Sequence, residues 1–546
     1  MLKKIFNSQA KNLTFAAILL SASALISRLL GLIRDRLLAG TFGAGEELDI
    51  YFAAFRIPDF VYGILITGGI AAVFLPVFSE YFKKNEEEAW KFSSNLFNCF
   101  LLLLVVLCGL LAIFTPWLMD LIAPGFSIES KGLAVALTRI MFLSPVFFGL
   151  ASIFSGILHY FNRFLIYSLA PVIYNLGIIF GILFLVPRFG LYGLAFGVIL
   201  GALFFWLIQI PSTKHSGYRY SAFLDFKNSG LIKVFKLMVP RTIGAAAYHI
   251  NLIVITAIAS TLAAGSIAVF NFANNLQYFP VGLVGISFSV AAFPLLSKNW
   301  AFDLKEEFKS VFSSTFRQIL FLIIPISLLV FIFRNEIVRL VLQTGEFGGS
   351  ETRLTSACLG VFCLGVIGFS FVPFLARVFY SFHDTKTPMF IGIASMVLNI
   401  GLCYFFNFLL GFSNFFQEFM VNALGLKWIT DIRVIGLPLA LSISGLFQFL
   451  FLMFFLRKKM AGLINREILQ SFWRVVLSSF LMSVFVWFSF AFFGALFDVQ
   501  SNLSVLIQTG MAALVGIAVF IFVNVYLKSP EVKTIWSALA DQFKRN

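Results

Sequence analysis

Charged side chains interrupt the first two long apolar stretches of the chain. Arg28, Arg34 and Asp35 lie in the first stretch, and Arg56 and Asp59 lie in the second. A charge near the centre of a lipid bilayer costs roughly 3 kcal/mol to insert, so such residues face a protein interior or a water-filled cavity. Guanidinium groups bind phosphates and carboxylates through paired hydrogen bonds and stay charged when buried. These residues therefore predict an anion-binding cavity inside a membrane.

Every basic residue within the apolar stretches is an arginine. The acids there are few, chiefly Asp35 and Asp59. The predicted membrane interior is thus net positive, which favours a polyanionic substrate over a cation. Arginines near span ends can instead cap carbonyl groups or extend to the lipid headgroups, and we expect this for Arg139, Arg241 and Arg377. The interior arginines are Arg28, Arg34, Arg36, Arg56, Arg139, Arg241 and Arg377.

Helical geometry groups the residues of the first stretch. Ser27 and Arg34 are seven positions apart and share one face of a helix, and Arg28 and Asp35 share a neighbouring face. An Arg28–Asp35 pair could also be purely structural, because buried charges often simply pair.

The composition is that of a membrane protein. The 546 residues are 60% apolar and 12% charged, against roughly 25% charged in a soluble domain. Long apolar runs without alternation predict an all-α polytopic membrane protein. We expect Pro58 and Pro280 to break the second and eighth spans. The fourteen expected spans are 13–41, 49–79, 92–116, 133–158, 165–186, 191–211, 237–261, 266–297, 318–333, 354–382, 389–410, 434–456, 475–496 and 503–527.

Lysine and arginine are distributed unequally between the two sets of loops. The set that includes both termini holds 26 basic residues, and the opposite set holds seven. Cytoplasmic loops are the more basic ones, so we expect both termini in the cytoplasm. The net charge of +15 does not indicate a nucleic-acid partner, because the charges fall in short loops between spans.

The chain repeats itself at an interval of 218 to 224 residues. For example, His159 matches His383, and Asn175 matches Asn399. Six spans per copy give both copies the same orientation, and such parallel repeats place a substrate cavity between two lobes. The expected divisions are an N-lobe (1–211), a cytoplasmic linker (212–236), a C-lobe (237–457), and a C-terminal helix pair with a cytoplasmic tail (458–546).

The second copy lacks the charges of the first. Its eighth span has neutral polar residues instead, namely Asn271, Asn274, Asn275 and Gln277. A charged lobe facing a hydrogen-bonding lobe suits a substrate with an anionic group and a sugar-like portion.

Familiar catalytic signatures are missing from the sequence. It has no GxxxxGK phosphate loop, no HExxH and no GxSxG. Cys358 and Cys363 lack the spacing of a zinc site. We therefore expect no enzymatic activity, cofactor or metal, and transport driven by an ion gradient or the membrane potential. His249 could relay protons or be a hydrogen-bonded core residue.

Six motifs resemble those of one known family. They are SRLLGLIRD (27–35), FGAGEELDIYFAAFRIPD (42–59), APGF (123–126), NRF (162–164), FPVGLVG (279–285) and FYSFHDTKTP (379–388). Over about residues 1–460 the chain resembles the MurJ/MviN lipid II flippases of the multidrug/oligosaccharidyl-lipid/polysaccharide exporter superfamily. The resemblance implies a multi-pass protein of the bacterial cytoplasmic membrane. Such a protein moves a lipid-linked peptidoglycan precursor outward by alternating access.

The resemblance also implies site residues and partners. Positions that matter for function in the family match Ser27, Arg28, Arg34, Asp35 and Asp49 here. We expect the substrate diphosphate to bind Ser27, Arg28, Arg34 and Arg56. Charge pairing or gating is expected of Asp35, Asp49 and Asp59. Membrane lipids and the cell-wall synthesis machinery are the other expected partners, and the chain is expected to be a monomer.

The chain departs from the family pattern in two places. In the second span, an arginine common near Tyr62 or Gly63 and an acid common at Thr67 are missing. In the eighth span, an Asp-Arg pair is replaced by Asn274-Asn275. Arg56 could compensate for one of these losses. Two alternatives therefore stay open: an exporter of another lipid-linked oligosaccharide or amphiphile, and a non-transporting membrane scaffold for wall enzymes.

Overall fold

The chain is helical throughout the part that the structure describes. This computed structural model describes residues 13–460, 462–463, 465–496 and 501–533, apart from the side chains of 13–19, 21, 67–69, 71–72, 240–241 and 243–245. Eleven helices in these ranges are long and apolar enough to cross a membrane, so the prediction of a multi-pass helical membrane protein is confirmed. The expected spans 13–41, 49–79 and 237–261 are helical but not among the eleven. The count of fourteen stays a prediction.

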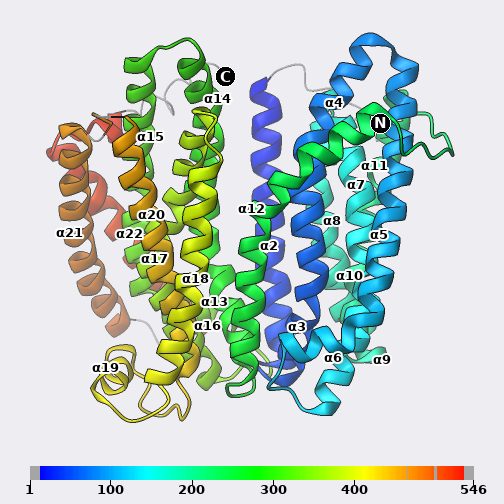
Figure 1. The fold of residues 1–546 in the computed structure, drawn as a ribbon. Coiled ribbons are helices and arrows are strands. Elements are labelled where there is room, and N and C mark those ends of the chain that lie inside the picture. The colour runs from blue at the N-terminus through cyan, green and yellow to red at the C-terminus, as the bar shows by residue number, and fades with distance from the viewer. Residues whose placement is uncertain (1–12, 461, 464, 497–500, 534–546) are drawn as a thin grey trace. The chain divides into compact units, whose positions relative to one another are not determined.

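The first compact unit contains the charged N-terminal helices. It extends to Ala268 and includes the short segment Thr344–Phe347. Its helices are α2 (Leu13–Phe42), α3 (Glu46–Val61), α4 (Ala71–Lys84), α5 (Glu86–Ile122), α6 (Ile128–Met141), α7 (Leu143–Tyr160), α8 (Phe164–Phe180), α9 (Val186–Phe189), α10 (Leu191–Leu207), α11 (Gln209–His215) and α12 (Ser229–Ser260). Although the repeat assigns α12 to the C-lobe, it packs here against α3, α4 and α5 (Figure 1). The lobe boundaries drawn from the repeat stay a prediction.

The second compact unit comprises Val269–Gln343 and the chain from Gly348 onward. Its helices are most of α13 (Ser266–Pro280), α14 (Ser287–Ala301), α15 (Lys305–Ile332), α16 (Arg334–Leu342), α17 (Gly349–Ser381), α18 (Lys386–Leu409), α19 (Phe415–Leu424), α20 (Gly436–Lys459), α21 (Arg466–Leu496) and α22 (Asn502–Tyr526). Helix α20 packs on α17 and α18, and the C-terminal pair α21–α22 packs on α15 through α21 (Figure 1). The pair is thus an integral part of this unit.

Two helices change pitch close to the prolines that were expected to break them. α3 ends three residues after Pro58 and continues as the π-helical segment Tyr62–Ile70. α13 ends at Pro280 and continues as the π-helical segment Val281–Ile286. Proline has no N–H for the regular hydrogen-bond ladder, and π-helical turns are frequent at functional sites. The two helices therefore do not break at these prolines. They continue through wider, π-helical turns.

The same helix-ending turn occurs in both copies of the repeat. Asn162 after α7 has a φ of +56°, and His383 after α17 has a φ of +60°. In both turns that residue donates its N–H to the carbonyl three positions back, and the next N–H donates to the carbonyl five back, which is the Schellman arrangement. These turns support the repeat. The two turns align His383 with Asn162. The sequence comparison aligned His383 with His159 instead, and that alignment is wrong by three residues.

The linker between the two copies is fastened to α5. The side chain of Asn95 donates to the carbonyl of Asp225 at 2.8 Å and accepts from its N–H at 2.7 Å. Asn98 donates to two further carbonyls of the same segment, both at 3.0 Å. Residues 218–226 thus form a linker strap along the N-terminal part of α5, near Asn95 and Asn98.

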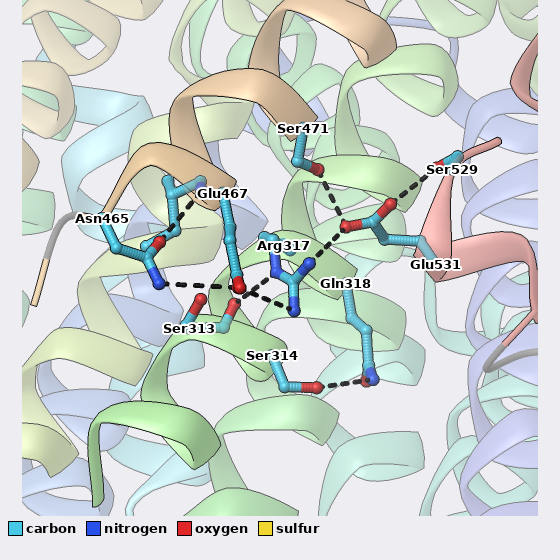
Figure 2. A network of polar contacts seen from close by, with 10 residues as sticks. Ser313, Ser314, Arg317, Gln318, Asn465, Glu467, Ser471, Ser529 and Glu531 are labelled. Carbon is cyan, nitrogen blue, oxygen red and sulfur yellow. Dashed lines mark hydrogen bonds and ion pairs between the residues drawn. The ribbon is translucent and has the colours of Figure 1, made fainter. Parts of the chain in front are cut away.

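A buried carboxylate joins the C-terminal helix pair to α15. Glu531 accepts hydrogen bonds from Ser471 at 3.0 Å and Ser529 at 2.6 Å. Arg317 on α15 pairs with Glu531 at 3.4 Å and with Glu467 at 3.6 Å (Figure 2). The start of α21 and the residues after α22 are thereby tied to α15.

Replacing Arg317 with alanine should loosen this junction. Breaking a buried ion pair costs about 3–5 kcal/mol, and because the Arg317 side chain is 18% exposed we expect a loss nearer 2 kcal/mol. The measurement is the Tm of the purified protein. Lys305 provides a matched control, since its pair with Asp303 is mostly exposed at 59% and 82% and should contribute little. Equal Tm values for Arg317→Ala and Lys305→Ala would contradict this role.

Candidate functional site

An ion pair on α2 is joined to α8 by one asparagine. Nε and Nη2 of Arg34 donate to the same oxygen of Asp35 at 3.0 and 2.8 Å, and Nη1 donates to Oδ1 of Asn175 at 3.2 Å. The amide nitrogen of Asn175 donates to the carbonyl and the hydroxyl of Ser27, both at 3.2 Å. Ser27 and Arg34 therefore share a face of α2, as predicted. The Asp35 side chain is 6% exposed and that of Arg34 is 23% exposed, so the guanidinium stays accessible.

Glycines hold α8 close to α10 and fix the position of Asn175. A Cβ at Gly177 would lie 2.3 Å from Cα of Gly201, and a Cβ at Gly181 would lie 2.6 Å from Cα of Gly197. Small residues of this kind let helix backbones approach closely inside a membrane. Because α8 packs against both α10 and α2, the buried side-chain amide of Asn175 is held in place by contacts with both helices.

A second arginine lies on α3. Nε of Arg56 donates to Oγ1 of Thr256 on α12 at 2.6 Å, and both residues are buried. Asp59, three positions later, interacts electrostatically with both Arg56 and Arg34. We call Arg34, Asp35, Arg56 and Asp59 the arginine cluster. It joins four of the predicted site residues within the first unit, and Ser27 contacts it through Asn175.

His249 packs against the π-helical segment beside the arginine cluster. A Cβ at Gly63 would lie 1.7 Å from Nε2 of His249, so the ring occupies space that only a glycine leaves open. His249 also interacts electrostatically with Arg56. The contact gives the histidine a packing role next to the charged residues.

The other interior arginines have partners of different kinds. Arg139 and Arg377 donate to backbone carbonyls of their neighbourhood at 2.9 and 3.4 Å, so both cap carbonyls as expected. Arg28 is half-buried on α2 and has interactions of its own. The side chain of Arg241 lies outside the described residues.

Asp49 caps a helix. Its Oδ2 accepts from the N–H of Gly265 at 2.7 Å, and its Oδ1 accepts from the N–H of Ala268 at 2.8 Å. These groups belong to the start of α13, where the helix dipole favours a negative charge. The buried carboxylate thus ties the first turn of α3 to the first turn of α13.

The loops around Asp49 interlock at glycines. Gly265 has a φ of +88°, and a Cβ there would lie 1.8 Å from the carbonyl oxygen of Ala44. Gly43 has a φ of +64°, a left-handed conformation that suits glycine. Gly125 donates its N–H to Oγ of Ser260 at 3.2 Å. The glycines of the FGAG and APGF motifs therefore serve close loop packing.

Two further contacts complete this packed end of the first unit. The Ser130 hydroxyl donates to the Glu46 carboxylate, and the Glu346 N–H donates to the Gly40 carbonyl at 3.0 Å. All of these loops belong to the set that the charge distribution predicts to be extracytoplasmic. The outer loop cluster is the set of segments 40–49, 123–130, 260–268 and 344–347.

The FYSFHDTKTP motif forms a charged turn in the second unit. Asp384 accepts from the N–H and the hydroxyl of Thr387 at 3.0 and 2.8 Å, and from Nζ of Lys459 at 2.8 Å. Burial alone would raise the pKa of Asp384, but these hydrogen bonds outweigh it and hold the pKa below its usual range. The turn fixes the start of α18 to the end of α20.

This turn should make stability depend on pH in the acid range. The pKa of Asp384 is lower in the folded protein than its unfolded value of about 3.9. Its ionised form therefore stabilises the fold above that pH, and the contribution disappears as the pH falls through the folded pKa. Asp384→Asn should lower the Tm near neutral pH and flatten the fall of Tm below about pH 4. A Tm profile parallel to that of the parent would contradict this assignment; Asp303→Asn is the exposed control.

The eighth span carries a neutral pair where the first copy has charges. The Gln277 amide donates to Oδ1 of Asn274 at 3.1 Å, and Gln277 is buried. This arrangement fits the sequence-based distinction between a charged first copy and a neutral second copy.

Known proteins share both this sequence and this fold. A family model described as lipid II flippase MurJ matches residues 38–508. A probable lipid II flippase MurJ of Buchnera aphidicola subsp. Acyrthosiphon pisum is 34% identical over 71% of this chain and 77% of its own length. Another, of Vibrio cholerae serotype O1, is 31% identical over 74% of this chain and 79% of its own. A solved structure of lipid II flippase MurJ in an inward closed conformation matches with a TM-score of 0.75 at 27% identity, covering 94% of this chain and 99% of that one. The chain belongs to the lipid II flippase MurJ family.

Proposed function

We propose that this protein moves lipid II from the cytoplasmic to the outer leaflet of the bacterial cytoplasmic membrane by alternating access, for cell-wall synthesis. Membership of the lipid II flippase family supports this function. The observation that carries it is the arginine cluster, in which Arg34 and Arg56 are held within a membrane unit. The negative charges of a bound diphosphate would stabilise these arginines inside the membrane.

The geometry of Arg34 suggests how a phosphate would bind. One edge of the guanidinium is occupied by Asp35, which keeps it oriented. Nη1 on the opposite edge donates to the neutral oxygen of Asn175 at 3.2 Å, which a phosphate oxygen can replace with a stronger, charge-assisted bond. Arg28 and Arg56 would supply the remaining positive charge and Ser27 a hydroxyl.

The acids have two proposed roles. Asp35 and Asp59 orient the arginines and limit their repulsion while the site is empty. Asp49 acts as a gate residue, because it holds the outer loop cluster together through two backbone N–H groups. Release of these bonds would open that end of the first unit.

The remaining features of the proposal rest on the family and on the charges of the loops. The chain makes and breaks no covalent bond and needs no cofactor, so it is a transporter and not an enzyme. Both termini face the cytoplasm, because the loops on their side hold the greater share of Lys and Arg. The protein acts as a monomer among membrane lipids and supplies the cell-wall synthesis machinery.

Complementation tests the function directly. Cells depleted of their own lipid II flippase should grow and keep their shape when this chain is expressed. Failure to rescue despite normal amounts of protein in the membrane would contradict lipid II as the substrate.

A specific departure from the family pattern favours one alternative. The chain has no arginine near Tyr62 and has Asn274-Asn275 in the eighth span, so its phosphate ligands differ from the family pattern. An exporter of another lipid-linked oligosaccharide would fail in complementation and still require Arg34. A non-transporting scaffold for wall enzymes would also fail in complementation, and its function would not depend on Arg34.

A further inference from the structure

A cavity of about 350 Å³ lies in the second unit, away from the arginine cluster. It is lined by residues of α16 and α17 on one side and of α21 and α22 on the other. We propose that this cavity binds the phosphodiester headgroup of an anionic phospholipid. The proposal is independent of the transported substrate, because every lining residue belongs to the second unit.

Two arginines from different helices line the cavity. Arg339 comes from α16 and Arg353 from the second turn of α17. Two guanidinium groups around one space can hold a phosphate between them, because each presents several N–H donors in a plane. Neutral polar groups, namely the side chains of Thr352 and Gln508, share the lining and can hydrogen-bond the glycerol part of a headgroup.

The charge of the cavity fits a diester. Arg339 and Arg353 contribute two positive charges, and Glu336 contributes one negative charge. The sum is one positive charge. A phosphodiester carries a single negative charge, whereas a phosphomonoester carries about −1.5 to −2 at neutral pH. The diester therefore neutralises the cavity, and a monoester would leave an excess of negative charge.

Apolar surface beside the cavity identifies the ligand as a lipid. Phe490 and Val505 form part of the wall. Next to Val505 on α22, Leu503 and Leu506 are exposed, and Leu496 at the end of α21 is exposed as well. Exposed leucines on membrane helices contact acyl chains. A phosphodiester in the cavity would thus continue into hydrocarbon along the C-terminal helix pair.

Native mass spectrometry of the purified full chain, titrated with phosphatidylglycerol, tests the proposal. Replacing both Arg339 and Arg353 with glutamine should weaken lipid binding ~10-fold, the loss expected for at least one charge-assisted hydrogen bond. Glu336→Gln should strengthen it, because the cavity gains net positive charge. Arg457→Gln is the matched control, since this exposed arginine follows the apolar part of α20 and does not line the cavity.

The outcomes separate the proposal from its rivals. An equal loss in Arg457→Gln would show non-specific attraction and overturn it, as would unchanged binding in the double variant or weaker binding in Glu336→Gln. Displacement of the lipid by low millimolar inorganic phosphate would show that a soluble anion is the ligand and overturn the lipid assignment. Retention of phosphatidylglycerol in competition with a lipid of neutral headgroup would support it. The lipid-free Tm of each variant checks that it is folded.

Discussion

Arg34→Ala is expected to abolish lipid II translocation while leaving protein in the membrane. The change removes the donor that faces Asn175 and is proposed to bind the diphosphate. It also removes the guanidinium that pairs with the buried Asp35 carboxylate; because the Arg34 side chain is 23% exposed, we expect a loss of about 2 kcal/mol in stability. The measurements are growth of flippase-depleted cells and translocation of lipid II in proteoliposomes.

A double variant separates binding from stability in this experiment. Arg34→Ala with Asp35→Asn removes both charges, so the Tm should recover, whereas translocation should stay absent. Arg34→Lys keeps the charge but loses the planar donor arrangement, and partial activity is expected. Arg139→Ala is the control, because Arg139 donates to a backbone carbonyl outside the arginine cluster. Full translocation by the double variant would refute the binding role of Arg34.

Asp49→Ala should loosen the outer loop cluster. It deletes the acceptor of two charge-assisted hydrogen bonds at 2.7 and 2.8 Å, each worth about 1.5–3 kcal/mol. We expect a loss of about 3–6 kcal/mol between the starts of α3 and α13, and a shift toward an open outer end. Asp49→Asn keeps one acceptor oxygen and should lie between the parent and the alanine variant.

Cysteine labelling can measure this opening. Ser266 is buried in the outer loop cluster, and Ser266→Cys changes its size little. The five native cysteines are all buried, which keeps the background low. In whole cells a membrane-impermeant maleimide should label Ser266→Cys slowly, and faster once Asp49→Ala is added. Equal labelling rates in the two backgrounds would mean that Asp49 does not hold this end closed.

The charged residues of the arginine cluster can be predicted from the sequence. Arginine and aspartate are conspicuous in apolar runs, so the sequence alone singles out Arg34, Asp35, Arg56 and Asp59. The helices also follow from the apolar runs, because burial in lipid requires both an apolar sequence and a fully hydrogen-bonded backbone.

The neutral members of the site could not be found in the same way. Asn175 and Thr256 are single polar residues in apolar helices, and their contacts join positions 141 and 200 residues apart. Only the match of Asn175 with Asn399 in the repeat hinted at a role. The capping of α13 by Asp49 likewise depends on a contact across more than 200 residues, which no local pattern encodes.

Local chemistry alone does not determine the structure around prolines and in loops. Pro58 removes an N–H, but whether the helix ends or widens depends on neighbours such as His249 against Gly63. Residues 212–236 contain enough polar groups to form a free loop. What fixes them is the complementary set of amides on α5, which the sequence placed at the start of a membrane span.

The linker strap has a practical consequence for anyone engineering this transporter. A long hydrophilic connection between two duplicated halves is the natural place to insert a fluorescent reporter or a protease site. Here such an insertion would compete with Asn95 and Asn98 for the backbone they bind. A reporter grafted between 218 and 226 would therefore disturb the packing of the linker strap against α5, and dividing the chain at this point would cut the strap itself.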